Sequence, residues 1–443
     1  MANRLSEDPA NKVLLVEAGG SDRRFFIQMP IGYGVTYHQK KVNWMYSTEP
    51  SPDADNKPSY WPRGKVMGGS SSINAMVYVR GNPKDFDEWS EAGNPGWSYK
   101  EVLPFFKKME SWQKGSDNFR GGDGPLNVSE VSNQLHPLCE NFLSAAQEIG
   151  IQLNPDMNGE KQEGVGNYQI TTHKGQRMSA SRAYIWPTKG RSNLTIVKNA
   201  RVTKVLIKNK RANGVEYLNS GKTHKATALR EVILSAGSIN SPQLLQLSGI
   251  GPKQVLSNAG VELVHELPGV GENLQDHLEV YFQYHCKKPI TLNSKLNLFS
   301  KGLIGVQWIL AKTGLGATNH FESCGFIRSR AGIEWPNIQY HFLPAAMRYD
   351  GNAAMKGHGY QVHAGVNKVS SRGCVKIKSS DPLAKPSIIF NYLETEEDRQ
   401  DWRDCIRLTR EILSENIAFI EINQATCFSM VRFILHFFRI IFE

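Results

Sequence analysis

A loop rich in glycine and serine is the first segment whose residue types point to ligand binding. Residues 63–74 read Arg-Gly-Lys-Val-Met-Gly-Gly-Ser-Ser-Ser-Ile-Asn and run into residues 75–79, an apolar stretch that predicts a strand. Glycine lets the backbone approach a planar or phosphorylated ligand closely, and hydroxyl groups add hydrogen bonds beside it. The loop therefore predicts a cofactor contact; the alternative is a tight turn without a ligand.

A second segment of this kind lies at an expected junction between a strand and a helix. Residues 231–237 predict a buried strand, and residues 237–251 read Gly-Ser-Ile-Asn-Ser-Pro-Gln-Leu-Leu-Gln-Leu-Ser-Gly-Ile-Gly. Ser241 and Pro242 suit the N-cap and first position of a helix over residues 243–247. The free N–H groups at a helix start attract anions. The alternative is a capped connecting helix with no ligand.

Glu17 is the third feature with a chemical meaning. It follows residues 13–16, Val-Leu-Leu-Val, a continuous apolar run typical of a buried parallel strand. In a dinucleotide-binding fold, an acidic residue about 20 positions after a glycine fingerprint accepts the ribose hydroxyls. Counted back from Glu17, that fingerprint would precede Met1, so the chain is expected to begin inside a βαβ unit. The alternative is a solvated carboxylate at a strand end.

Composition limits the remaining function classes. A chain of 443 residues with 40% hydrophobic residues predicts two interleaved domains. The formal charge is +10, but the 52 lysines and arginines are scattered and form no basic motif, so nucleic-acid binding is not expected. The six cysteines lack paired spacing and no histidine lies at zinc spacing, so neither a metal site nor a disulfide framework is expected.

The two ends of the chain carry no recognisable targeting signal. Residues 1–17 match neither a signal peptide nor a transit peptide, and no run of 18 or more apolar residues occurs. Residues 427–443 form an atypical apolar tail that contains two arginines. The tail is too short and too broken to predict a membrane span.

Periodicity predicts the elements that would position these residues. Residues 3–8 predict the end of a helix, and residues 194–197, 202–207 and 214–218 predict three strands of a small β-meander. Residues 338–343 and 360–365 alternate in polarity, which predicts strands with one covered face.

Together, residues 63–74 and 237–251 resemble the two signatures of the glucose-methanol-choline (GMC) oxidoreductase family, with a departure only at Met67. The resemblance continues through Asp123-Gly-Pro125 and residues 267–277, and it extends from about residue 2 to 425. Within the family, blocks such as residues 60–64, 74–81, 321–329 and 339–344 are most similar to the choline dehydrogenases of mitochondrial type.

The resemblance implies a bound FAD. It assigns Glu17 to the adenosine ribose, the glycine-rich loop to the isoalloxazine and pyrophosphate side, Val202 to the adenine and Gly237 to the pyrophosphate. The cofactor-binding residues expected on this basis are Glu17, Gly68, Gly69, Ser70, Ser71, Asn74, Val202 and Gly237. No metal is expected.

The resemblance also implies oxidation of choline to betaine aldehyde, with electrons passed to a quinone-type acceptor. A quaternary ammonium has no N–H to donate, so a carboxylate and aromatic faces must hold it. Glu322 is the candidate carboxylate; a surface or salt-bridged glutamate is the alternative. Trp335, Tyr340 and Phe342 could supply aromatic faces, although ordinary core positions explain them better.

No catalytic residue is assigned. His277, His341 and His363 are expected to be the most buried of the 12 histidines, but the family's catalytic histidine and asparagine blocks are absent. The chain as it stands is therefore expected to be an inactive product, truncated at both ends. The alternatives are a non-catalytic fragment and another GMC alcohol or sugar dehydrogenase.

The expected architecture is α/β. A Rossmann-like FAD-binding domain, residues 1–100 and 192–280, lacks its first strand and glycine fingerprint. It is interleaved with an α+β substrate-binding domain on an antiparallel sheet, residues 101–191 and 281–426. The resemblance further implies a mitochondrial location at the inner membrane, and the net positive charge suits peripheral contact with an anionic membrane.

Overall fold

The computed structural model describes residues 1–51, 56–131, 135–348, 354–414 and 423–424, which excludes the apolar tail 427–443. Its largest sheet has six strands, and every neighbouring pair in it is antiparallel. In spatial order these strands are β22 (Asn423–Gln424), β16 (Glu279–Cys286), β19 (Gly359–Val366), β18 (Ile338–Leu343), β17 (Ser323–Ile327) and β6 (Gly164–Asn167).

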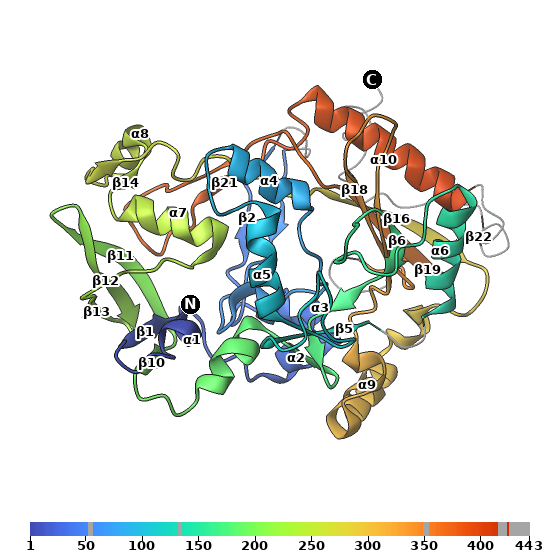
Figure 1. Ribbon diagram of the computed structural model, residues 1–443, viewed down its shortest axis with the longest axis horizontal. Helices are drawn as coiled ribbons and strands as arrows, with labels where there is room; N and C mark the ends of the chain where they lie inside the picture. The colour runs from blue at the N-terminus through green and yellow to red at the C-terminus, as the bar shows by residue number, and fades with distance from the viewer. Residues whose placement is uncertain (52–55, 132–134, 349–353, 415–422, 425–443) are drawn as a thin grey trace.

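Two helices cover one face of this sheet, as Figure 1 shows on its right-hand side: α6 (Pro137–Glu148) and α10 (Glu396–Ser414). The side chains that alternate toward these helices are apolar and buried, among them Phe342 and Val362. The alternation read from the sequence gives the bounds of β18 correctly and those of β19 to within one residue. The opposite face carries polar and aromatic side chains.

A second region contains a parallel pair and a separate meander. Strand β1 (Val13–Val16) has the predicted bounds and pairs in parallel with β10 (Leu194–Val197). The prediction that β1 is buried is wrong, because Leu14 is exposed and the other three residues are half-buried. The meander consists of β11 (Ala200–Lys208), β12 (Arg211–Asn219) and β13 (Lys222–Thr227).

Two-residue turns explain why the meander begins one strand later than predicted. Asn209 and Lys210, between β11 and β12, both have positive φ, as do Ser220 and Gly221 between β12 and β13. Such turns match the twist of a hairpin and favour pairing of consecutive strands. Strand β10 pairs with β1 instead, so it lies outside the meander.

Two predicted strands do not form. Residues 75–79 make only an isolated bridge at Val77, because Met76 has positive φ and the flanking backbone bonds irregularly to residues 158–171. The buried strand predicted over residues 231–237 does not form: residues 231–236 are exposed or half-buried and pair with no described strand, and Gly237 begins a helix. Helix α7 (Gly237–Leu247) starts before the predicted residue 243, so Pro242 lies inside it.

The remaining elements are short. Helix α1 ends at Leu5 rather than near Asp8. No helix among the described residues is long and apolar enough to cross a membrane. The other helices and strands are α1 (Ala2–Leu5), α2 (Phe25–Gln28), α3 (Tyr33–Thr36), β2 (Tyr46–Ser47), β3 (Tyr60–Trp61), α4 (Pro83–Glu91), α5 (Tyr99–Met109), β4 (Glu110–Trp112), β5 (Leu126–Glu130), β7 (Gln169–Ile170), β8 (Thr172–His173), β9 (Gln176–Arg177), β14 (Ile250–Gly251), α8 (Lys253–Asn258), β15 (His265–Glu266), α9 (Leu298–Ala311), β20 (Cys374–Lys376) and β21 (Ser387–Ile389).

Candidate functional site

The glycine-rich loop adopts a backbone that only glycine accommodates easily. Gly68 and Gly69 both have positive φ, 89° and 56°, and residues 69–72 form one tight helical turn. A Cβ atom on Gly68 would lie 2.5 Å from the Ser72 hydroxyl oxygen and 3.1 Å from the backbone nitrogen of Ser181. Gly68 is therefore required by its backbone conformation and by the close packing of the loop, whereas Gly69 is favoured by its backbone conformation alone.

The serine hydroxyls of the loop already have partners within the protein. Ser70 Oγ accepts a hydrogen bond from the Gly64 N–H at 3.1 Å. Ser71 Oγ donates to the Gly68 carbonyl at 2.6 Å and accepts from the Ala180 N–H at 2.8 Å. These bonds fix the loop. A hydroxyl that also contacted a ligand would do so in addition to its bond within the loop.

Arg177 lies under the loop and was not foreseen from the sequence. Its Nη1 donates to the Asn74 carbonyl at 2.7 Å and to the Asn74 side-chain oxygen at 2.8 Å, and its Nε donates to Ile27. Burial lowers the pKa of Arg177 to about 10. The Nη2 atom is buried without a partner, which leaves a free donor of a cationic group beside the predicted cofactor loop.

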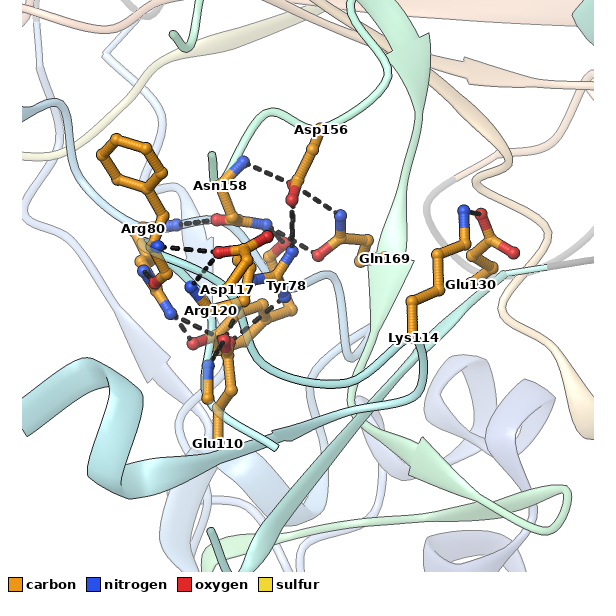
Figure 2. A network of polar contacts seen from close by, with 12 residues as sticks. Tyr78, Arg80, Glu110, Lys114, Asp117, Arg120, Glu130, Asp156, Asn158 and Gln169 are labelled. Carbon is orange, nitrogen blue, oxygen red and sulfur yellow. Dashed lines mark hydrogen bonds and ion pairs between the residues drawn. The ribbon is translucent and has the colours of Figure 1, made fainter. Parts of the chain in front are cut away.

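A buried ion network fixes the segment that follows this loop (Figure 2). Glu110 accepts from Arg80 Nη2 at 2.8 Å and from Arg120 Nε at 2.9 Å, and Arg120 also pairs with Asp156. The Arg80 N–H donates to Asn158 at 2.7 Å. The network therefore ties residues 78–80 to strand β4 and to residues 156–158.

Glu17 lies next to the loop. Its carboxylate accepts the Gly19 N–H at 2.7 Å; burial raises its pKa, which that bond and Lys65 partly offset. A bridge joins Gly20 to Val66, and a Cβ atom on Gly19 would lie 2.0 Å from the Lys65 carbonyl oxygen. Strand β1 and the loop are thus packed backbone to backbone.

The other two predicted cofactor residues lie on neighbouring elements. The Ala200 N–H donates to the Glu17 carbonyl at 2.9 Å, so β11, with half-buried Val202, begins beside β1. Gly237 is exposed at the start of α7, with φ of 91° and no atom near its missing Cβ. Helix α7 packs on β11 through the Ser248 hydroxyl, which accepts the Val205 N–H at 2.8 Å.

The polar face of the six-stranded sheet carries a carboxylate surrounded by rings. Glu279 Oε1 lies 3.1 Å from His363 Nδ1 and 3.9 Å from His341 Nε2. Tyr281 stacks on His363 with centroids 3.9 Å apart, and Phe321 meets the same ring edge-on at 5.3 Å. Neighbouring strands β16, β18 and β19 supply the carboxylate and both imidazoles.

Hydrogen bonds define the tautomer of His363. The Met347 N–H donates to Gln361 Oε1 at 2.9 Å, which identifies that atom as oxygen. Gln361 Nε2 therefore donates to His363 Nε2 at 2.6 Å, and the ring proton sits on Nδ1, directed at Glu279.

Glu279 interacts with two imidazoles and, among the described residues, with no lysine or arginine. Burial lowers the pKa of His341 to about 4. Burial by itself raises the pKa of Glu279, but its interactions with His363, His341 and Tyr281 lower it below the usual range. In the described part of the chain, the ion-pair partners of Glu279 are these two imidazoles.

Glu322 is buried but points at a helix start. Its carboxylate accepts the His136 N–H at 2.7 Å, at the N-cap of α6, and burial raises its pKa. The adjacent Phe321 instead contacts His341 and His363. Glu322 is therefore next to the ring-lined face in the chain, but its carboxylate accepts a hydrogen bond from the start of α6.

The remaining candidates from the sequence are three aromatic residues and one histidine. Tyr340 and Phe342 are fully buried core residues, as expected, and Trp335 lies beneath Lys368 Nζ at 3.9 Å. The expectation that His277 is buried is wrong, because its side chain is exposed in the loop before β16.

Comparison with known proteins identifies the family. Two sequence profiles described as GMC oxidoreductase match residues 14–279 and residues 369–430. The chain belongs to the GMC oxidoreductase family. It is an oxidoreductase of CH–OH groups with FAD as its cofactor, and the predicted α/β fold class is confirmed.

The relatives are bacterial. The chain is 59% identical over 416 residues to an oxygen-dependent choline dehydrogenase of Photobacterium profundum, covering 94% of this chain and 73% of that protein. It is 51% identical to a protein of the same name in Brucella ovis, covering 94% and 75%. These relatives lend no support to a mitochondrial location.

Solved structures have the same fold. Pyridoxine 4-oxidase from Mesorbium loti superposes with a TM-score of 0.87 at 28% identity, covering 99% of this chain and 83% of that one. A formate oxidase structure gives a TM-score of 0.88 at 26% identity, covering 96% and 80%.

The residues present fit FAD. Arg177 offers an unpaired buried donor, the Gly68–Gly69 backbone allows close approach, and Glu17 and Val202 lie on adjoining strands. When bound, FAD supplies a flavin ring that accepts a hydride. Arg177 and the loop serines fix the backbone of the glycine-rich loop by hydrogen bonds.

Proposed function

We propose that this protein oxidises choline to betaine aldehyde. The observation that carries the proposal is Glu279, a carboxylate with aromatic rings around it, two imidazoles as its ion-pair partners and no lysine or arginine partner among the described residues. Choline bears a quaternary ammonium that cannot donate an N–H hydrogen bond, so negative charge and π faces are the means of holding it. The bacterial relatives named choline dehydrogenase support the same substrate.

Two carboxylates are candidates for the ammonium group. Glu322, the residue expected from the sequence, is adjacent to Phe321 but accepts a backbone N–H of α6. Glu279 faces the rings directly and lacks a lysine or arginine partner among the described residues. We therefore assign the main charge contact to Glu279 and a supporting role to Glu322.

The proposed cofactor contacts are those expected from the sequence, with Arg177 added. Glu17 would bind the adenosine ribose, and Val202 would contact the adenine. The backbone of Gly68, Gly69, Ser70, Ser71 and Asn74 would lie along the flavin and pyrophosphate, with Gly237 offering its N–H group to a phosphate.

We further propose that electrons leave to a quinone-type acceptor. The relatives are named oxygen-dependent choline dehydrogenases, so molecular oxygen is the electron acceptor to compare with a quinone. An oxygen electrode, with and without a soluble quinone, separates the two. Choline turnover that continues anaerobically only with quinone supports the proposal, whereas turnover coupled to oxygen alone contradicts it.

The first test is the visible spectrum of the purified chain after incubation with FAD and desalting. Retained flavin that is bleached anaerobically by choline supports the function. Retained flavin that another alcohol or a sugar bleaches, while choline does not, overturns the substrate assignment. A colourless protein favours the non-catalytic alternative.

The carboxylates are tested with choline and its uncharged carbon isostere, 3,3-dimethylbutan-1-ol. A lost contact between unit charges at about 4 Å, at an effective dielectric constant near 20, corresponds to about 4 kcal/mol before solvent compensation. Glu279→Gln should raise the KM for choline by roughly 100-fold and change that for the isostere little. Equal effects on both substrates, or a selective effect of Glu322→Gln alone, would remove Glu279 from the ammonium site.

A further inference from the structure

Helix α9 (Leu298–Ala311) exposes its apolar residues to solvent. Leu298 is 88% exposed and Leu310 is 81% exposed, although surface helices of globular proteins normally turn such residues inward. Figure 1 shows α9 projecting at the lower edge of the molecule, away from the sheet. Its exposed apolar side chains are Leu298, Phe299, Leu303, Val306, Ile309 and Leu310, which we call the α9 surface.

The α9 surface is one continuous stripe. At roughly 100° per residue, its six side chains fall within about 140° of the helix circumference. Trp308 lies on the opposite side and anchors the helix: its Nε1 donates to the Gly175 carbonyl at 2.7 Å, and Phe25 packs on its ring at 5.4 Å. The helix is therefore held in place with its apolar side outward.

The chain segment that carries the α9 surface has charges of one sign. Residues 280–321 contain five lysines and neither aspartate nor glutamate. Lys295 and Lys301 are exposed at the N-terminal part of the helix, and Lys312 lies 3.8 Å above the ring of Trp308 at its C-terminal end. Phe25 and Phe26, both partly exposed, extend the apolar area on the adjoining α2.

We propose that the α9 surface inserts into the headgroup region of an anionic lipid bilayer. An interfacial helix needs an apolar face toward the acyl chains and lysines at the level of the headgroups, and α9 has both. Its 14 residues span about 21 Å, less than the roughly 30 Å of a bilayer's hydrocarbon core, so we place it in the plane of the interface.

The charge argues for lipid rather than a second copy of the chain. Two copies meeting through α9 would bring their lysines together, with no acidic residue of residues 280–321 to compensate. An anionic bilayer supplies both the negative charge and the apolar phase.

Vesicle sedimentation with the full chain tests this proposal. Wild-type protein should pellet with phosphatidylcholine vesicles that contain phosphatidylglycerol, and more weakly with phosphatidylcholine alone or at raised salt. Leu298→Glu with Leu310→Glu should lower the partition coefficient by at least about tenfold.

The matched control carries the same added charge on exposed leucines elsewhere. Leu229 is 92% exposed and Leu383 is 56% exposed, so Leu229→Glu with Leu383→Glu should bind vesicles nearly as the wild type does. Circular dichroism checks that both double variants fold. Equal loss in both variants, or no vesicle binding by the wild type, overturns the proposal. So does a dimer in sedimentation velocity that only the α9 variant dissociates, without lipid binding, since that result identifies a second copy as the partner.

Discussion

The buried network around Glu110 should contribute heavily to stability, and Glu110→Gln is the substitution that tests it. Glu110 is fully buried and accepts four hydrogen bonds, three from Arg80 and Arg120 and one from the Gly121 N–H. The amide is nearly isosteric, so the change removes the charge and adds donors facing two guanidinium groups without leaving a cavity.

The expected loss of unfolding free energy depends on the hydrogen bonds that Arg80 and Arg120 retain in the variant. Breaking a buried ion pair by removing one partner costs about 3–5 kcal/mol. Arg120 retains Asp156, at 2.9 and 2.8 Å, and Arg80 Nη1 still donates to the Phe119 carbonyl at 2.6 Å. Because these contacts remain, we expect the lower end, about 3 kcal/mol of unfolding free energy.

Urea unfolding followed by circular dichroism measures this loss, with Glu163→Gln as the control. Glu163 pairs with Arg328 at 2.7 Å, but the two side chains are 42% and 47% exposed. Removing the same charge there should cost under about 1 kcal/mol. If Glu110→Gln costs no more than Glu163→Gln, with unchanged denaturant dependence, the network is not the structural anchor described above.

Three further predictions concern single buried groups. Arg177→Met should reduce the FAD retained after desalting, because Asn74 loses its donor; retention equal to wild type would contradict this. Burial lowers the pKa of His320 to about 4, below the unfolded value near 6.5, so the unfolded state binds the extra proton first. Stability should therefore fall as the pH drops from about 6.5 toward 4, and His320→Asn should flatten that dependence in thermal melts. Asp398→Ala should cost about 2–4 kcal/mol in urea unfolding, since the Ser370 and Ser371 N–H groups lose their acceptor; under about 1 kcal/mol would refute it.

Local patterns in the sequence predicted the elements that are determined locally. Strand β18 has the predicted bounds because alternation along a strand records directly which face is covered. The strand predictions over residues 75–79 and 231–237 were wrong because an apolar run carries no information about its pairing partner. Strand β10 shows the same limit: its sequence fits a meander, yet its partner is β1, nearly two hundred residues earlier.

The same distinction separates the site residues that were foreseen from those that were missed. The glycine-rich loop was visible because its function lies in one contiguous segment. Arg177 contacts Asn74 from 103 positions away, and Glu279 contacts His363 from 84 positions away. Neither pair has a spacing that marks it in the sequence, and both depend on how strands assemble.

The two faces of strand β19 show why the polar side of the sheet points to chemistry. Val362 and Ala364 face α10 and are fully buried, which is sufficient to stabilise the strand. Gln361 and His363, on the other face, form a chain of hydrogen bonds that ends on Glu279. A buried polar chain of this kind stabilises a fold no better than apolar packing of the same volume would. Its specific product is an imidazole with a defined tautomer next to a carboxylate that has no lysine or arginine partner among the described residues, and this arrangement suits the binding of a positively charged group.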